Sequence, residues 1–347
     1  MYGRNAPALT RLGAAAAMTI ALAGGSPASA QEHSWLLSDL SSAAKAEGAL
    51  IVYGSMNEQE ALPLWKLFED ATGVKVSYVR SSDTQIMAKV AIENRAGQHT
   101  WDIAFTTTVP QLPSAYLAQF DPPEAKGLMA EARDPNRRWY GGYANYNAPA
   151  YNTNFVHKAD LPKTYEEFAA HKEWAGKIAI DDTDNEWLAA ICAFYGDARG
   201  QALVKSIVAA LDPVITDGHL ALARSVGSGE YWLALNNFLP LTLNVKMSGA
   251  PTDFWLIEPV PLIFGSVGVN TLAPHPSAAK LAGNFVLSKE GETFMTRKGR
   301  LPTRPDVTTN PPEVGEMLKE RKIMPVVFSG DDQRKWQKTY NELFGRH

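Results

Sequence analysis

The sequence has little of what several classes of protein require. A single cysteine, Cys192, stands in 347 residues, so the chain can form no internal disulfide and holds no CxxC zinc or redox centre. We expect it to be a small buried hydrophobe. The 33 lysines and arginines form no block and are outnumbered by 37 acidic residues, which gives a net charge of −4. The composition therefore predicts a folded protein that has no nucleic acid among its partners.

Catalytic and metal-binding signatures are also missing. The sequence contains no GxSxG elbow, no GxxxxGK[ST] loop, no GxGxxG turn and no HExxH helix, and its seven histidines include no i,i+4 pair. An acidic group at Asp181, Asp182, Asp184 and Glu186 lacks the spacing of a calcium loop, so we interpret it as a solvated turn at a helix start. No catalytic residue, metal or cofactor is predicted.

Long apolar runs are absent too, and the longest lies near the N-terminus. Residues 12–22 are too few to span a bilayer comfortably, and they follow Arg4 and Arg11 and precede the small-residue site Ala28-Ser29-Ala30. This pattern predicts a signal peptide over residues 1–30 that is cleaved after Ala30. An N-terminal anchor is the alternative, although no cysteine follows the apolar run to carry a lipid.

Short apolar segments alternate with helical patterns in the first part of the remaining chain. The expected strands cover residues 49–53, 74–79 and 102–105, and the expected helices cover residues 58–72 and begin again near residues 80–83. Gly73 is placed to end the first of these helices. Ile86, Val90 and Ile92 are expected on the buried side of the second. Alternation of this kind predicts an α/β domain with a mainly parallel sheet.

The same pattern continues to the C-terminus. Further strands are expected at residues 139–151, 177–180, 231–235 and 267–272, and further helices at residues 201–211, 220–226, 276–285 and 336–343. The segment 139–151 is rich in glycine and aromatic residues and suits an extended crossover strand. Another helix is expected after Asp184, which is placed at its N-cap with Trp187 at N3. With no repeat and no long linker, the pattern indicates two lobes joined by extended crossings.

Polar side chains follow the expected strands. Those after the first three strands are Ser55, Asn57, Ser82, Asp83, Thr106 and Thr107. Asn236 and Asn237 follow the strand at 231–235 in the same way. In open α/β sheets ligands bind beyond the carboxyl ends of the strands, where helix N-termini favour anionic or strongly polar groups. Each residue alone fits a helix cap as well as a ligand contact, but the convergence of three loops favours a polar site.

The order of several segments carries a resemblance. YGSMNE, FEDATGVKVSYV, WDIAFT, PAYNTNFV, LPKTYEEF, WAGKIAI, PHPSAAKLAGNFVLSKEGETFM and GRLPTRPDV together resemble the periplasmic solute-binding proteins of ABC importers, in the group called ferric-iron-like. The resemblance covers about residues 49–307. It implies a two-lobed type II fold in which each lobe is a mainly parallel sheet flanked by helices, with the ligand in the cleft between the lobes.

The resemblance also implies an organisation and a set of partners. Lobe one is expected at residues 31–142 plus 264–347, and lobe two at residues 143–263. A monomer in the periplasm is expected to capture a small-molecule solute and deliver it to a membrane permease driven by an ATPase. It is not expected to be an enzyme.

The resemblance bears on the ligand as well. Ferric members carry two adjacent tyrosines after the strand that matches residues 231–235, whereas this chain reads NNFLPL at residues 236–241, which disfavours ferric iron. Relatives that bind phosphonates, sugar phosphates or amines suggest Asp184 and Trp187 as contacts, with core packing of Trp187 nearly as plausible. An apolar turn at residues 238–241 beside Asn236 and Asn237 would suit a ligand with one greasy and one polar part.

Several functions are therefore open. The first is the capture of a small polar organic solute, anionic or zwitterionic, and the runner-up is a receptor for ferric iron or a metal chelate. An exported hydrolase or lyase on the same scaffold is a third hypothesis, although no nucleophile, base and orienting group can be recognised. A purely sensory or interacting protein would differ only in what docks on the closed lobes.

Overall fold

The computed structural model describes residues 1–3 and 33–345. The predicted signal sequence, from Arg4 to the cleavage site after Ala30, lies outside these residues. The chain from His33 onward forms one compact unit, to which the following description applies. None of the helices in the described ranges combines the length and the hydropathy needed to cross a bilayer.

Strands and helices alternate along this unit. The strands are β1 (Ala49–Gly54), β2 (Lys75–Arg80), β3 (Ile103–Thr106), β4 (Trp139–Asn152), β5 (Ile178–Asp181), β6 (Val214–Thr216), β7 (Leu233–Phe238), β8 (Thr252–Phe254), β9 (Val260–Val269) and β10 (Ile323–Pro325). The α-helices are α1 (Ser38–Glu47), α2 (Glu58–Thr72), α3 (Asp83–Arg95), α4 (Asn185–Tyr195), α5 (Asp197–Leu211), α6 (His219–Ser228), α7 (Leu239–Met247), α8 (Pro276–Val286), α9 (Lys289–Arg297), α10 (Pro312–Lys319) and α11 (Gly330–Leu343).

The strands join in the order β2-β1-β3-β9-β4-β7-β5-β6, with β10 beside β9 and β8 beside β4. At one end β1 pairs in parallel with β2 and β3, and at the other β5 pairs in parallel with β6 and β7. We call the part built on β1, β2 and β3 lobe one and the part built on β5, β6 and β7 lobe two. The fold is thus the predicted two-lobed α/β fold.

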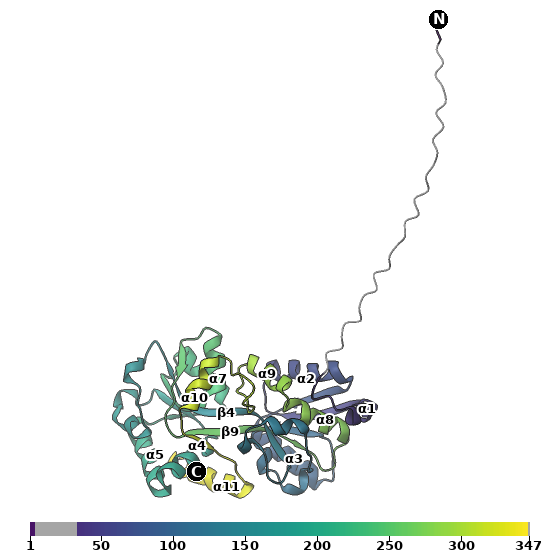
Figure 1. Cartoon of the computed structure of the whole chain (residues 1–347). Helices are drawn as coiled ribbons and strands as arrows, with labels where there is room; N and C mark the ends of the chain where they lie inside the picture. The colour runs from purple at the N-terminus through teal and green to yellow at the C-terminus, as the bar shows by residue number, and fades with distance from the viewer. Residues whose placement is uncertain (4–32, 346–347) are drawn as a thin grey trace. The chain divides into compact units, whose positions relative to one another are not determined.

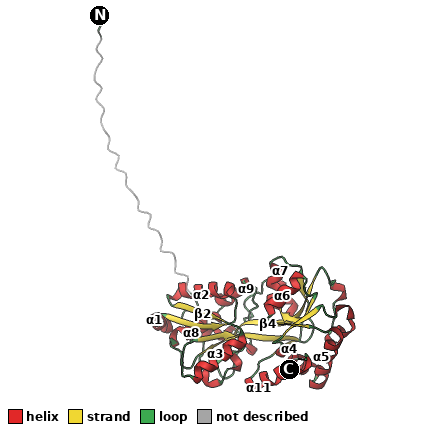
Figure 2. Cartoon of the chain, turned by 180° about the vertical axis from the view of Figure 1, so that it is seen from behind, coloured by secondary structure: helices red, strands yellow, loops and turns green. Residues whose placement is uncertain are grey.

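Two long strands run between the lobes. β4 pairs antiparallel with β9 from Trp139 opposite Gly268 to Tyr146 opposite Leu262, and the residues of β4 beyond this stretch pair with β7 and β8. The register shifts between Gly141 and Tyr143. In Figures 1 and 2, α2, α7 and α9 lie to one side of these two strands and α3, α4 and α11 to the other. The predicted crossover strand at residues 139–151 is confirmed as β4.

Most of the helices and strands of lobe one were predicted correctly from the local sequence. Gly73 ends α2 in the left-handed conformation, with φ 76°, and its N–H donates to the carbonyl of Glu69. Ile86 and Val90 of α3 are buried as expected, but Ile92 is 59% exposed. Six residues turn a helix by about 240° beyond one full revolution, which carries Ile92 away from the face of Ile86.

Two strand predictions in the second half of the chain were wrong in extent. β7 begins at Leu233 and continues to Phe238, so Asn236 and Asn237 lie inside a strand and not in a loop after it. β9 begins at Val260, well before the expected start at residue 267. The expected apolar turn at 238–241 is the end of β7 and the start of α7, where Pro240 fits the first helical turn because it needs no hydrogen-bond donor there.

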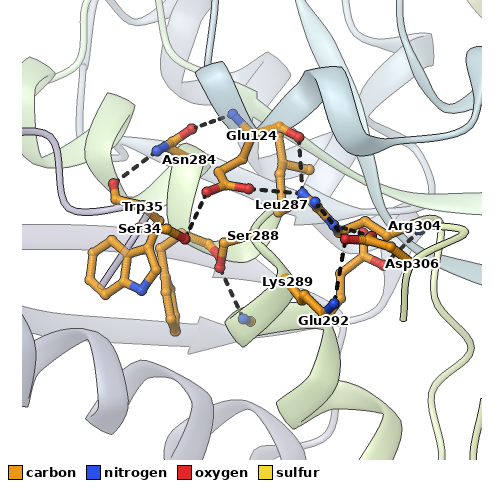
Figure 3. Close-up of polar contacts among 12 residues, drawn as sticks. Ser34, Trp35, Glu124, Asn284, Leu287, Ser288, Lys289, Glu292, Arg304 and Asp306 are labelled. Carbon is orange, nitrogen blue, oxygen red and sulfur yellow. Dashed lines mark hydrogen bonds and ion pairs between the residues drawn. The ribbon is translucent and has the colours of Figure 1, made fainter. Parts of the chain in front are cut away.

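A buried polar network fastens the segment after α9 to lobe one (Figure 3). The guanidinium of Arg304 donates to the carboxylates of Glu124, at 2.8 Å, and Asp306, at 2.9 Å, and to the carbonyl of Leu287. Glu292 of α9 accepts from the backbone N–H groups of Thr303 and Arg304, both at 2.9 Å. These bonds hold the chain between α9 and α10 against the layer formed by α8 and α9.

The last helix departs from the predicted organisation. Residues 264–347 were expected to return to lobe one, but Trp336 and Tyr340 of α11 belong to the apolar cluster that contains Trp187 of α4 and Leu211 of α5. The Tyr340 hydroxyl donates to the carbonyl of Asp181 at 2.6 Å. The apolar face of α11 is thus buried against the core of lobe two. The structure does not test the other predicted lobe boundaries, which stay predictions.

Candidate functional site

A cavity of about 590 Å³, called the cleft below, lies between the two lobes. Lobe one contributes residues that follow β1, β2 and β3, and lobe two contributes residues that follow β5 and β6. The central strands add Tyr143, Asn145 and Ile263, and α11 adds Gln333 and Gln337. The carboxyl ends of the parallel strands of both lobes therefore meet at the cleft, which is where open α/β sheets bind ligands.

Most of the residues predicted in lobe one line the cleft. They are Ser55, Asn57, Ser82, Asp83 and Thr107. Asn57 stands at the N-cap of α2 without a side-chain capping bond, so the cap does not use its amide. Ser82 does cap α3: its hydroxyl accepts from the N–H of Gln85, and the Gln85 side chain accepts from the N–H of Ser82, both at 3.4 Å. The side chain of Asn57 is thus free of its helix cap, whereas the hydroxyl of Ser82 is engaged in one.

Thr106 has a different position. Its side chain is fully buried and does not line the cleft. Its hydroxyl donates to the carboxylate of Asp83, which also accepts from the N–H of Thr107 at 3.1 Å. Asp83 therefore ties the start of α3 to the end of β3. Thr106 therefore supports the cleft wall from behind and is not part of the cleft surface.

The residues predicted in lobe two lie behind the cleft wall. Asp184, Trp187, Asn236 and Asn237 are all buried, and none of them lines the cleft. Asn236 and Asn237 are buried because β7 extends through them. Trp187 packs edge-on against Tyr165 at 5.8 Å between ring centroids, in the core of lobe two. Trp187 thus takes the core position that was its alternative, and none of the four residues lies on the surface of the cleft.

Asp184 belongs to a buried polar cluster. It stands at the N-cap of α4 but makes no capping bond, and its Oδ1 accepts from Nδ2 of Asn147 at 3.2 Å. Nε2 of His219 lies 3.5 Å from Asp184 Oδ1 and 3.7 Å from Asp181 Oδ1. Burial raises the pKa of Asp184 to about 7, against the opposing effect of His219. Burial lowers the pKa of His219, but the two carboxylates outweigh it and raise the value overall.

Other side chains of lobe two form the cleft wall. They are Asp182, Thr183, Glu186, Asp217, His219, Leu220, Phe238 and Leu241. Successive helical residues point about 100° apart, so the rotation that turns Trp187 into the core turns Glu186 to the cleft. The rings of His219 and Phe238 stack with centroids 3.8 Å apart. The acidic run 181–186 was visible in the sequence, but the rotation of α4 about its axis was not.

Sequence reasoning also missed a buried arginine. Nε and Nη2 of Arg300 lie 2.8 and 2.7 Å from the carboxylate of Glu60, and its Nη1 reaches Asn145 Oδ1 at 3.5 Å. The guanidinium lies over the ring of Tyr143, 4.7 Å from its centroid. Arg300 follows a glycine after α9, in a loop that has no periodicity to reveal it. Its pairing with Glu60 neutralises both charges beside the cleft.

Within the described residues, no group of three or more His, Cys, Asp or Glu side chains is placed to hold a metal. Tyr143 is the one tyrosine among the described residues that line the cleft. Burial raises its pKa to about 12, which opposes the phenolate form that hard cations prefer.

The chain is similar in sequence to known solute-binding proteins. The profile of a family described as bacterial extracellular solute-binding protein matches residues 64–322. The chain is 22% identical over 282 residues to an Fe(3+)-binding periplasmic protein of Serratia marcescens, which covers 78% of this chain and 82% of that protein.

Solved structures share the fold. The periplasmic binding protein AfuA of Actinobacillus pleuropneumoniae, with fructose-6-phosphate bound, superposes with a TM-score of 0.75 at 21% identity, over 86% of this chain and 99% of that chain. Iron-bound HitA of Pseudomonas aeruginosa gives a TM-score of 0.71 at 20% identity, over 85% and 99% of the two chains. At such identities the likeness shows the fold and leaves the ligand open.

Proposed function

The chain belongs to the bacterial extracellular solute-binding protein family, and from that premise we propose that it is the periplasmic solute-binding component of an ABC importer. The observation that carries the proposal is the cleft between the lobes, lined by polar side chains at the carboxyl ends of parallel strands. In this role the mature chain begins at Gln31 and passes its solute to a membrane permease that an ATPase drives.

The solute that fits the cleft best is a small polar organic molecule. Hydroxyl, amide and charged side chains line the cleft from both lobes, and Phe238, Leu241 and Ile263 add apolar surface. A volume of about 590 Å³ lies within the range of small-molecule sites. Such a solute would be enclosed between the lobes and released when they separate.

A thermal-shift screen against a solute library tests this proposal, together with mass spectrometry of any molecule that co-purifies with the native protein. A true ligand at a hundred times its dissociation constant should stabilise the protein by about 2.7 kcal/mol, a rise of a few degrees in Tm. Asn57→Ala should reduce the shift at little cost in stability, because Asn57 makes no capping bond. Asn136→Ala, at an exposed site outside the cleft, should leave the shift unchanged. Equal shifts in the two variants would contradict binding in the cleft.

A ferric receptor is the second candidate, because two of the compared proteins are an Fe(3+)-binding protein and an iron-bound structure. The segment 236–241 has no tyrosine, and Tyr143 is buried with a raised pKa. We therefore expect the protein to stay colourless when ferric citrate is added. A visible charge-transfer band that a chelator removes would favour the ferric receptor instead.

A further inference from the structure

The two walls of the cleft carry opposite charge. From lobe one comes Arg80, since Glu60 neutralises the charge of Arg300, and the carboxylate of Asp83 on the same wall is bonded to Thr106 and Thr107. From lobe two come the carboxyl groups of Asp182, Glu186 and Asp217, and His219 adjoins the buried carboxyl groups of Asp181 and Asp184 behind it. A solute enclosed here meets positive charge on one side and negative charge on the other.

Glu186 is the carboxylate that most needs a partner. It is half-buried in the cleft wall, its carboxylate accepts from its own backbone N–H, and no cation of the described residues lies within ion-pair distance of it. The groups around it are mainly acidic, with Asp184 behind it and Asp83 across the cleft, and His219 is the one opposing charge. Burial raises the pKa of Glu186 to about 8. A carboxylate left in this state is stabilised by a cation that arrives with the ligand.

Arg80 and the start of α3 form the opposite pole. Arg80 lines the cleft and has no carboxylate within ion-pair distance among the described residues. The first turn of α3 also lines it through Ser82, Thr84 and Gln85. A helix of this length presents unpaired N–H groups and a partial positive charge at its N-terminus. Together, a guanidinium and a helix start favour a carboxylate, phosphate or phosphonate group.

We propose that the cleft is built for a dipolar solute, with its anionic group at Arg80 and the start of α3 and an ammonium group at Glu186. This inference rests on the proposed function and narrows its ligand class. A simple anion would bring no cation beside which the Glu186 carboxyl could ionise, and a simple amine would leave Arg80 without a counter-charge. A molecule with both charges satisfies the two walls at once and draws the lobes together.

Matched triplets of compounds test the inference by thermal shift and calorimetry. One triplet is phosphoethanolamine, ethyl phosphate and ethanolamine, and the other is γ-aminobutyrate, butyrate and butylamine. Fructose 6-phosphate and ferric citrate complete the set. In the wild-type protein a dipolar compound should bind at least tenfold more tightly than either of its single-charge analogues.

Two variants that each remove one charged group locate the poles. Glu186→Gln should weaken binding of the dipolar compound at least tenfold and leave the anionic analogue unaffected, while Arg80→Gln should weaken both. Circular dichroism should show that both variants fold, because neither side chain makes an internal ion pair. Lys89→Gln, which removes a cation on α3 outside the cleft, is the control for Arg80→Gln.

The outcomes separate the inference from the proposed function. The inference would be overturned, while solute binding stands, if the anions bound as tightly as their dipolar partners or if Glu186→Gln left the affinity unchanged. It would also be overturned if fructose 6-phosphate or ferric citrate were the only compound to bind, or if a co-purified solute had no cationic group. No response to any of these compounds, with no solute co-purified and none found in a wider library, would contradict the proposed function itself.

Discussion

At the scale of single residues, two adjacent residues at the start of α4, Glu186 and Trp187, point in different directions. Trp187 lies in the core and Glu186 lines the cleft, although the sequence favoured Trp187 as the contact. The sequence shows that an aromatic and an acidic residue are adjacent. Which of the two side chains points into the core depends on how α4 packs against Tyr165 and its neighbours. That packing is a tertiary property, which local pattern does not determine.

Trp187→Ala should therefore act on stability. Removing a fully buried indole from the core of lobe two should cost about 3–5 kcal/mol in the free energy of unfolding, measured by urea denaturation. The ligand-induced rise in Tm should persist, because the side chain does not line the cleft. Trp187→Phe should lose less, since it keeps part of the ring packing. Loss of the ligand shift in a variant of unchanged stability would contradict this assignment.

Asp184 should make stability depend on pH. Its pKa in the fold, about 7, lies above its value in an unfolded chain, so its protonated form stabilises the fold at low pH. That contribution is lost as the pH rises through about 7. Asp184→Asn, which is neutral at every pH, should lose less stability between pH 5.5 and 8.5 than the wild type does.

Urea denaturation at the two pH values measures this difference. Asp39→Asn, at an exposed position of α1, is the control and should keep the wild-type pH dependence. The same slope in Asp184→Asn and the wild type would show that Asp184 does not change protonation in this range.

At the scale of elements, strands with a short apolar run or a regular alternation of apolar and polar residues were the easiest to predict. β1, β3 and β5 follow short apolar runs and β2 follows an alternating pattern, and all four lie within about one residue of their expected bounds. β7 and α7 were harder, because Asn236 and Asn237 resemble a loop and Pro240 resembles a turn. The buried Asn237 of β7 is hydrogen-bonded to His219, a residue of another element, which local pattern cannot show.

The helix α11 should help to hold the end of β5 in place. Tyr340→Phe removes the hydroxyl that donates to the carbonyl of Asp181, just before the cleft residues Asp182 and Thr183. We expect a loss of about 1 kcal/mol in the free energy of unfolding. A weaker affinity for the solute should accompany it, because the loop after β5 loses a support.

Tyr195→Phe is the matched control for this prediction. The hydroxyl of Tyr195 donates to the exposed Glu166 at 2.9 Å, so the same chemical change there should cost less and leave affinity unchanged. Calorimetric titration and urea denaturation of the two variants measure both effects. Equal losses at the two sites would argue against a special role for the contact with α11.

At the scale of the whole molecule, the alternation of strands and helices was enough to predict two lobes with polar loops facing a common site. It was not enough to assign α11, whose apolar face packs on lobe two although the chain before it is fastened to lobe one through Arg304. The choice between lobes depends on which core has room for Trp336 and Tyr340. That information is spread over α4, α5 and β5 and is absent from the helix itself.

Binding should draw the lobes together. Small-angle X-ray scattering should show a smaller radius of gyration when the identified solute is present at saturation, because polar groups of both lobes then share one ligand. Asn57→Ala, measured at the same solute concentration, should show a smaller change. An unchanged radius in the saturated wild-type protein would contradict closure.

The pairing of β4 with β9 restricts how the two lobes can move during closure. Two separate linkers would let the lobes rotate freely, but strands hydrogen-bonded to each other from Trp139 to Tyr146 must bend and twist as one ribbon. The relative motion is thereby reduced to few degrees of freedom, and little orientational entropy is lost on the way to the closed form. Different solutes would then end in nearly the same outer surface. A transporter could recognise that surface as a sign of occupancy without any contact with the cargo.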